Sequence, residues 1–248
     1  GEQEWIKTIG TDSLDNVTGI EAGNDGSLFI SVEHESKQYL YKMNSDGNNE
    51  SNSLSPIIKM DIDNDGFIYL VGSTTGDLNG MLPENNQRSH ESFGADFVSR
   101  DFISKLDDKG NRIWAKVIDF NFDPTYTAIT TSRDGSIYLA GETSSLFRTK
   151  SDIFIRKFDS DGNQIWTKTF GTTGNDRLFD IKNEIDNEIY MIGGLHTTQK
   201  YGVSSAYTDA FLGKLTEKNS NISESQDSNS ITYEENNGEI LSENTIID

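Results

Sequence analysis

The sequence contains no cysteine, only three prolines and only three histidines in 248 residues. Without cysteine there can be no disulfide bond, no thiolate metal site and no cysteine nucleophile. No apolar run reaches the roughly 18 residues that a membrane-spanning helix needs, so we expect no membrane insertion. A net charge of −20 repels polyanions, so we expect no nucleic-acid partner and no anionic membrane surface.

Several catalytic signatures are missing as well. The sequence has no Gly-x-Ser-x-Gly nucleophile turn, no glycine-rich phosphate loop and no His-Glu-x-x-His zinc motif. Acidic residues are so frequent that spacing alone does not single out a glycosidase pair. No helical 3.6-residue period of useful length occurs in the core region, and this absence favours an all-β fold.

The most informative feature present is a phrase that occurs four times. It consists of an Asp/Asn-Gly turn, loosened in the last copy, and a following strand of β-branched and aromatic residues, a combination typical of a hairpin. Repeats of this kind indicate stacked, equivalent units. The copies lie at residues 24–30, 64–70, 133–139 and 185–191.

Two further phrases accompany the first. One ends in Phe-x-x-Lys or a close variant, and the other begins at Trp5, Trp114 and Trp166. Apolar and polar residues alternate in both, as in strands with one buried face. The pattern therefore predicts that one unit forms four short antiparallel strands, which we name A, B, C and D in chain order. Such a unit matches a β-propeller blade, and a β-sandwich with many hairpins is the alternative.

The combined pattern resembles the bacterial β-propeller repeat family called SBBP. Its elements are Trp-x-Lys-x-Phe-Gly, then Asp-Gly-x-Ile-Tyr-Leu-x-Gly-x-Thr, then Asp-x-Phe-x-x-Lys-Phe-Asp-x-x-Gly-Asn-x-x-Trp, and residues 132–171 match best. The resemblance covers residues 5–216. It implies a β-propeller or partial propeller of four-stranded blades, with about four blades visible, in a secreted or cell-surface bacterial protein.

The sequence departs from this pattern at three places. The first unit lacks a recognisable strand D at residues 51–56, the second carries an insertion, and the fourth loses its closing Trp phrase. Residues 5–9 read as a strand D without its own unit, which would complement the fourth unit. A ring or partial ring of four to five blades is one interpretation, and a piece of a larger propeller with further blades or domains is the other.

The end of the chain has a different composition. Residues 217–248 are acidic and rich in Asn and Ser, and they contain too few apolar residues to form a core. We therefore predict a propeller domain at 1–216 and an acidic tail or linker at 217–248. Within the tail, residues 231–233 and 240–241 are candidate short strands, one of which would complete the fourth unit.

One segment resembles half of a calcium loop. Asp61, Asp63 and Asp65 alternate before Gly66, as in the Asp-x-Asp-x-Asp-Gly start of a Ca²⁺-binding loop. The second half of the loop fails, because Gly72 stands where an acidic ligand is required. A hairpin turn between strands A and B explains the same residues, and both interpretations stay open.

The insertion at residues 73–100 and the segment 195–207 predict a recognition surface. In a propeller, B–C and D–A loops share one face, where ligands often bind. His34, His90 and His196 are all expected in B–C loops. The candidate contacts to a carbohydrate or protein ligand are His90, Phe93, Phe97, His196 and Tyr201.

A lysine recurs at the same point of strand C in all four units. A catalytic lysine would be expected once, so this recurrence indicates a structural role, such as an ion pair to a neighbouring blade. Three functions stay open: a non-enzymatic binding or structural module, a glycan hydrolase or lyase that uses loop carboxylates, and a Ca²⁺-stabilised scaffold. The four residues are Lys42, Lys105, Lys157 and Lys214.

Overall fold

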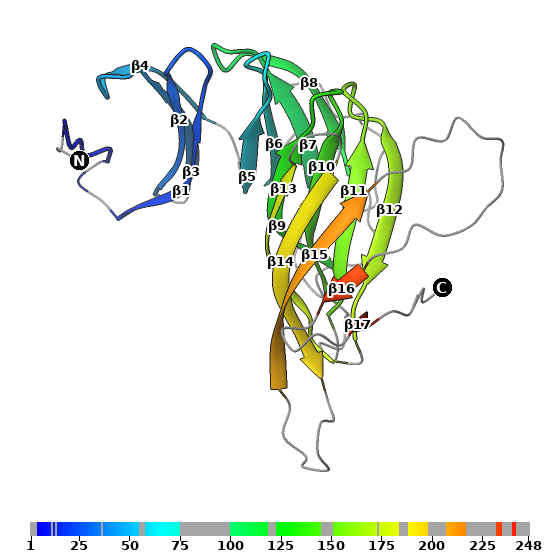
Figure 1. Ribbon diagram of the computed structural model, residues 1–248. Helices are drawn as coiled ribbons and strands as arrows, with labels where there is room; N and C mark the ends of the chain where they lie inside the picture. The colour runs from blue at the N-terminus through cyan, green and yellow to red at the C-terminus, as the bar shows by residue number, and fades with distance from the viewer. Residues whose placement is uncertain are drawn as a thin grey trace, which may run out of the picture. The chain divides into compact units, whose positions relative to one another are not determined.

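The computed structural model shows an all-β chain (Figure 1). Within the part of the chain that it describes there is no helix, and so none that could cross a membrane. The chain divides into two compact parts, each larger than one sequence repeat. They are called the first unit, Gly1–Asp119, and the second unit, Phe120–Asp248. The described residues are 4–10, 12, 14–35, 37–54, 58–74, 100–118, 123–144, 151–172, 174–183, 188–197, 207–216, 232–234 and 240–241.

Four antiparallel sheets make up the two units, and in each sheet consecutive strands are neighbours. This is the blade organisation of a β-propeller, so the predicted fold class is confirmed. The first unit contains β1 (Asp15–Ala22), β2 (Leu28–His34), β3 (Lys37–Met43) and β4 (Asn49–Leu54), then β5 (Lys59–Ile62), β6 (Ile68–Thr74), β7 (Arg100–Leu106) and β8 (Arg112–Val117).

The second unit contains a four-stranded and a five-stranded sheet. The third sheet comprises β9 (Asp123–Thr131), β10 (Ile137–Ser144), β11 (Ile153–Phe158) and β12 (Gln164–Phe170). The fourth comprises β13 (Arg177–Asn183), β14 (Glu188–Thr197), β15 (Tyr207–Thr216), β16 (Thr232–Glu234) and β17 (Ile240–Leu241).

The recurring Gly turns close the hairpins with one repeated geometry. In the second sheet, Gly66 has a φ of +85° and its N–H donates to Asp63 O over 3.1 Å. A left-handed φ is accessible to glycine without a steric penalty, which explains the repeated Gly. The Asp63 carboxylate accepts the N–H groups of Asp65 and Phe67 at 3.0 and 2.9 Å, so this side chain holds its own turn.

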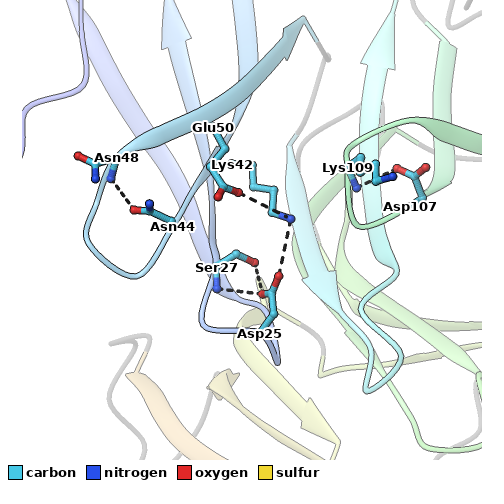
Figure 2. Close-up of polar contacts among 8 residues, drawn as sticks. All are labelled: Asp25, Ser27, Lys42, Asn44, Asn48, Glu50, Asp107 and Lys109. Carbon is cyan, nitrogen blue, oxygen red and sulfur yellow. Dashed lines mark hydrogen bonds and ion pairs between the residues drawn. The ribbon is translucent and has the colours of Figure 1, made fainter.

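Figure 2 shows how similar turns use other side chains. Asn44 Oδ1 accepts the N–H of Asn48 at 2.9 Å, and Asp107 Oδ1 accepts that of Lys109 at 2.9 Å. Asp25 instead accepts the Ser27 N–H at 2.9 Å. An amide therefore serves as well as a carboxylate at this position, since only an acceptor oxygen is needed.

A ladder of side chains across strands B, C and D explains why the aromatic residue and the lysine recur together. Tyr138 pairs with Lys157, which pairs with Trp166, and the Lys157 ammonium lies 5.3 Å from the Tyr138 ring centre. The contacts seen for these lysines lie inside their own sheets, and the ion pair to a neighbouring blade stays a prediction. The other aromatic–lysine pairs are Phe29 with Lys42, Tyr69 with Lys105 and Tyr190 with Lys214.

Packing inside each unit follows one rule. We call the sheet face that carries the strand-B aromatic residue its aromatic face, and the other its opposite face. The aromatic face of the third sheet packs against the opposite face of the fourth, as Tyr138 and Ile155 meet Ile189 and Met191. In the first unit, Phe29 and Leu40 of the first sheet likewise meet the second sheet, here at residues Ile68, Leu70 and Phe102.

Strand D of the first sheet corrects the sequence analysis. Residues Asn49–Leu54 form β4, with Ser51 paired to Lys42, although their side chains lack an apolar alternation. An outermost strand needs only backbone pairing on one side, so it can form without the apolar alternation that predicts a strand.

The lone strand predicted at residues 5–9 is wrong, because residues 4–10 contain no strand. They lie across the C–D turn of the first sheet instead: the Trp5 indole N–H donates to Ser45 O at 3.1 Å, and Lys7 Nζ donates to Asn48 Oδ1 at 3.3 Å. In the fourth sheet, the strand beside β15 is β16, with Thr232 paired to Lys214. The domain boundary at 216/217 stays a prediction.

Candidate functional site

Asp176 organises one end of the second unit. It lies just before β13, its side chain is fully buried, and it belongs to the connection between strand D of the third sheet and strand A of the fourth. Its Oδ1 accepts the Thr172 hydroxyl at 2.9 Å and the His196 backbone N–H at 2.8 Å, while Oδ2 accepts the Thr172 N–H. A buried carboxylate requires such donors, because desolvation otherwise disfavours its charge.

At this end of the second unit, hydrogen bonds link the D–A connection to both B–C connections. The Asp176 N–H donates to Ser151 O at 2.8 Å, next to the start of β11. The Thr172 hydroxyl reaches the His196 carbonyl at 2.6 Å, near the end of β14. Asp176 and Thr172 therefore link residues from three chain connections, and we call Glu142, Asp152, Thr172, Asp176 and His196 the acidic platform.

Two backbone positions beside the acidic platform, Gly171 and Gly174, have no room for a side chain. A Cβ on Gly171 would collide with the carboxylates of Asp176 and Asp152, and a Cβ on Gly174 would collide with the His196 ring. Both carboxylates thus lie close to the backbone at Gly171. The Gly that ends the Trp phrase is explained by this close approach.

Glu142 supplies a third carboxyl group at the end of β10. Burial raises the pKa of Glu142 above its ordinary value, and the Leu178 N–H, which donates to Oε1 at 3.2 Å, and the charge of Arg177 oppose this rise. A half-buried carboxyl with a raised pKa can carry a proton at mildly acidic pH, as a general acid requires.

The first sheet contains a counterpart with a different arrangement. Asp15 follows Gly10 at the same interval as Asp176 follows Gly171. The Asp15 carboxylate contacts Nδ1 of His34, whose Nε2 lies 2.8 Å from the Tyr41 hydroxyl. His34 is 5% exposed, so this histidine is a buried core residue with a partner on each ring nitrogen.

The place of the histidine along strand B explains why the two aspartates have different partners. The A–B pairs of the first and fourth sheets have the same register, and the register equivalent of His34, which pairs with Asp15, is Leu195, one residue before His196. Because successive side chains of a strand point to opposite faces, a shift of one residue turns the histidine ring away from the carboxylate. Asp176 therefore binds the His196 backbone, whereas Asp15 binds the His34 ring.

The predicted ligand contacts are placed as follows. His196 lies in β14, inside the platform, and not in a loop; His34 ends β2, so the prediction of B–C loops is wrong for both. The other four candidate contacts, His90, Phe93, Phe97 and Tyr201, lie outside the described residues.

The structure brings no calcium cluster together around the Asp61 segment. Asp63 holds the A–B turn, and Asp61 pairs across the sheet with Tyr69. In the described ranges, no group of three or more His, Cys, Asp or Glu residues could hold a metal ion. The hypothesis that Asp61, Asp63 and Asp65 bind Ca²⁺ stays a prediction from sequence.

Sequence analysis missed Asp15 and Asp176. The available signal was Gly-Thr-x-x-x-Asp, which follows the Trp phrase at Gly10 and again at Gly171. The aspartate lies beyond the turn that follows the Trp phrase, so the phrase itself does not contain it.

Comparisons with known proteins identify similar structures only. No protein-family model matches the sequence, and no curated protein matches it. Among solved structures, the chain is similar to a protein of unknown function from Dyadobacter fermentans, with 10% identity and a TM-score of 0.49 over 83% of this chain and 67% of that chain.

Two further similar structures carry enzyme-related descriptions. A bifunctional GH43-CE protein of Bacteroides eggerthii is 12% identical, with a TM-score of 0.44, over 83% of this chain and 24% of that one. A subtype N11 neuraminidase-like protein of A/flat-faced bat/Peru is 10% identical, with a TM-score of 0.42, over 83% and 62%. Similarity at this level carries no argument about activity.

Proposed function

We propose that this protein is a non-enzymatic binding or structural module of a secreted or cell-surface bacterial protein, which recognises a carbohydrate or protein ligand at the acidic platform. The observation that carries the proposal is the set of hydrogen bonds that the Asp176 carboxylate accepts. A fully buried carboxylate joins three chain connections at one end of the second unit. Binding sites gain affinity when their supporting residues are fixed before the ligand arrives.

The chemistry of the platform suits a neutral, hydroxyl-rich ligand or a basic protein surface. Glu142 and Asp152 are half-buried carboxyl groups, and His196, whose ring lies against Gly174, is half-buried as well. Carboxylates accept hydrogen bonds from sugar hydroxyls and from lysine or arginine side chains. The overall charge of −20 favours a basic partner over an acidic one.

The resemblance to SBBP repeats supports the proposed location outside the cell. His90, Phe93, Phe97 and Tyr201 are proposed as additional ligand contacts, since they belong to long B–C segments of the second and fourth sheets. Aromatic side chains in such segments would add apolar contact area to the polar platform.

A glycan array together with a panel of basic surface proteins tests the proposal. We expect wild-type binding to weaken at least about tenfold in His196→Ala, because the loss of about one hydrogen bond or ring contact has this size. Ile165→Ala, at an exposed position of the third sheet, is the matched control and should bind normally. A wild-type chain that binds neither class of ligand would overturn the proposal.

Glu142 favours one alternative, a glycan hydrolase or lyase. Its raised pKa is the property that a general acid needs. The discriminating measurement is turnover of any array glycan that binds: turnover that disappears in Glu142→Gln while binding persists would establish catalysis. Binding without turnover in both proteins supports the non-enzymatic module.

A further inference from the structure

Three side chains of the first sheet, Asp15, His34 and Tyr41, form a hydrogen-bonded relay. The Asp15 carboxylate contacts Nδ1 of His34, and the Tyr41 hydroxyl lies 2.8 Å from Nε2 of the same ring. A hydroxyl, a base within hydrogen-bond reach and a third group that orients the base are the parts of an activated nucleophile. The relay belongs to the first unit, whereas the acidic platform belongs to the second.

The proton positions of this relay follow from the carboxylate at one end. A carboxylate can only accept, so Nδ1 of His34 carries the ring proton that it donates to Asp15. In a neutral imidazole the other nitrogen, Nε2, is then the acceptor, and the Tyr41 hydroxyl donates to it. The hydroxyl proton of the tyrosine therefore already points at a base.

Packing holds the relay in this geometry. A Cβ on Gly10 would collide with the Asp15 carboxylate, so this carboxylate lies against the backbone at Gly10. The His34 side chain is buried, and its ring meets the Tyr41 ring edge-on with 5.7 Å between the ring centres. Tyr41 itself is half-buried. The base is thus shielded from water, while part of the tyrosine remains exposed.

The equivalent positions of the other three sheets carry different residue types. The register equivalents of Tyr41 are Ser104, Arg156 and Gly213. Those of His34, counted from the strand-B aromatic residue, are Thr74, Thr143 and Leu195. Residues shared by every sheet support the repeated fold, as the aromatic–lysine pairs do. A relay whose histidine and tyrosine stand in one sheet only is the pattern expected of chemistry.

We propose that Tyr41 is a nucleophilic acyl-acceptor site, which takes an acyl group from an ester. The Tyr41 oxygen attacks the ester carbonyl, a bond forms between this oxygen and the acyl carbon, and the bond from that carbon to the alcohol oxygen breaks. Nε2 of His34 takes the phenol proton and returns it to the departing alcohol oxygen, while Asp15 positions the imidazole. The products are an O-acyl tyrosine and one alcohol.

Charge and base strength favour a neutral ester as the acyl donor. The net charge of −20 repels phosphoryl and sulfuryl donors, which are anions. An ordinary tyrosine titrates near pH ~10, so a phenol without a base reacts slowly at neutral pH. General-base assistance raises such rates by roughly 10²- to 10⁴-fold. Tyr41 should therefore be acylated faster than tyrosines that have no imidazole partner.

Acetylation of the 248-residue chain by 4-nitrophenyl acetate at neutral pH tests the proposal. Peptide mass spectrometry locates the acetyl groups, and hydroxylamine removes those on tyrosine but not those on lysine. We expect Tyr41 to be acetylated at least about tenfold faster than two reference tyrosines, Tyr39 and Tyr190. Tyr39 lies two residues away on the same strand. Tyr190 is the matched control, because it is also half-buried and donates at 2.9 Å to a weaker base, the Glu188 carboxylate.

Substitutions in the relay separate activation of Tyr41 from support of the fold. His34→Gln and Asp15→Asn should each slow acetylation of Tyr41 at least about tenfold, and Tyr41→Phe should remove this product. The Asn amide can donate to Nδ1 and so stabilise the tautomer whose proton is on Nε2, a change that ¹⁵N NMR of the His34 ring detects. Tyr190→Phe should leave the Tyr41 rate unchanged, and circular dichroism checks that each variant is folded.

Two outcomes would overturn the proposal. The first is equal acetylation of Tyr41, Tyr39 and Tyr190 in the wild type, or no acetylation of Tyr41 at all. This comparison lies within one chain, so it decides the matter even where a variant does not fold. The second is a folded Asp15→Asn or His34→Gln chain in which Tyr41 reacts as fast as in the wild type, because the relay would then only support the core.

Discussion

The first and fourth sheets use one motif for two purposes. In both, Gly-Thr-x-x-x-Asp leads the chain into strand A. In the first sheet the aspartate orients the ring of the buried His34, and in the fourth it binds the backbone of His196 and the turn at Thr172. The motif therefore repeats the position of a carboxylate without repeating its partner, because the histidine stands one residue later along strand B in the fourth sheet than in the first.

The same two sheets also differ in what covers strand A. The isoleucine at the equivalent position is buried in the fourth sheet and exposed in the first. Identical residue types at identical register positions thus contribute very different free energies of unfolding. The predictions below separate the two sheets, beginning with the largest difference.

Ile181→Ala should lower the free energy of unfolding by about 3 kcal/mol, because it leaves a cavity in the core between the third and fourth sheets. Ile20→Ala at the equivalent exposed position should change it by less than about 0.5 kcal/mol. Urea denaturation measures the free energy of unfolding of both variants. Equal losses at the two positions would contradict the difference in burial.

Substitution of the two histidines should also change the free energy of unfolding by different amounts. His34→Ala removes contacts to Asp15 and to the Tyr41 hydroxyl inside the core, and we expect a loss of about 2 kcal/mol. His196→Ala keeps the backbone N–H that Asp176 accepts, so we expect a loss of at most about 1 kcal/mol. Thermal and urea unfolding give the order, and a larger loss for His196→Ala would show that its ring supports the platform.

Two carboxyl groups of the third sheet, Glu142 and Asp134, should make opposite contributions to the pH dependence of the free energy of unfolding. Burial raises the pKa of Glu142 above its ordinary value near 4.5. Between that value and the folded-state pKa, the unfolded chain has already lost the proton that the folded chain keeps, so the free energy of unfolding falls as pH rises. Glu142→Gln should remove this fall, as unfolding curves across the mildly acidic range would show.

Asp134 in the same sheet provides the contrasting case. Burial alone would raise the pKa of Asp134, but hydrogen bonds from Ser132 and Ser136 outweigh it and lower the pKa below 3.8. The stabilisation from this group is present above that value and is lost as pH falls through the folded-state pKa. Asp134→Asn should therefore flatten the acid side of the profile and leave the Glu142 slope unchanged.

The calcium hypothesis predicts the smallest effect. Asn44 holds its turn with an amide oxygen, so Asp63→Asn should keep the A–B turn and the melting temperature in the absence of calcium. If calcium binds there, millimolar Ca²⁺ raises the melting temperature of the wild type and not that of Asp63→Asn. A wild type whose melting temperature ignores Ca²⁺ would remove the hypothesis.

Local chemistry made much of the fold predictable. The Gly at position 66 and its counterparts need a left-handed φ, and the alternation around Tyr138 is that of a strand. Strand β4 escaped prediction because its residues carry no apolar alternation, and pairing with β3 alone defines it. Residues 4–10 failed in the opposite way: their alternation is strand-like, yet they lie across a turn and pair with no strand.

The candidate site was less predictable than the fold. The sequence predicts a loop position for His196, whereas its contact to Asp176 uses the backbone N–H, which sequence patterns do not report. Asp176 lies in a polar, loop-like stretch, and only the repeated Gly-Thr-x-x-x-Asp spacing sets this fully buried aspartate apart in the sequence. Only the meeting of three chain connections makes it the centre of the platform.

The amino-acid sequence by itself determined much of the repeated unit: antiparallel hairpin strands, glycine turns in the first three copies, and an aromatic residue and a lysine at matching points of every copy. These depend on backbone dihedrals and on period-two alternation, which act over a few neighbouring residues. Tertiary structure decided which face of each sheet is covered and which carboxylate is buried. Those outcomes depend on the register between distant strands, where a shift of one residue sends a side chain to the other face.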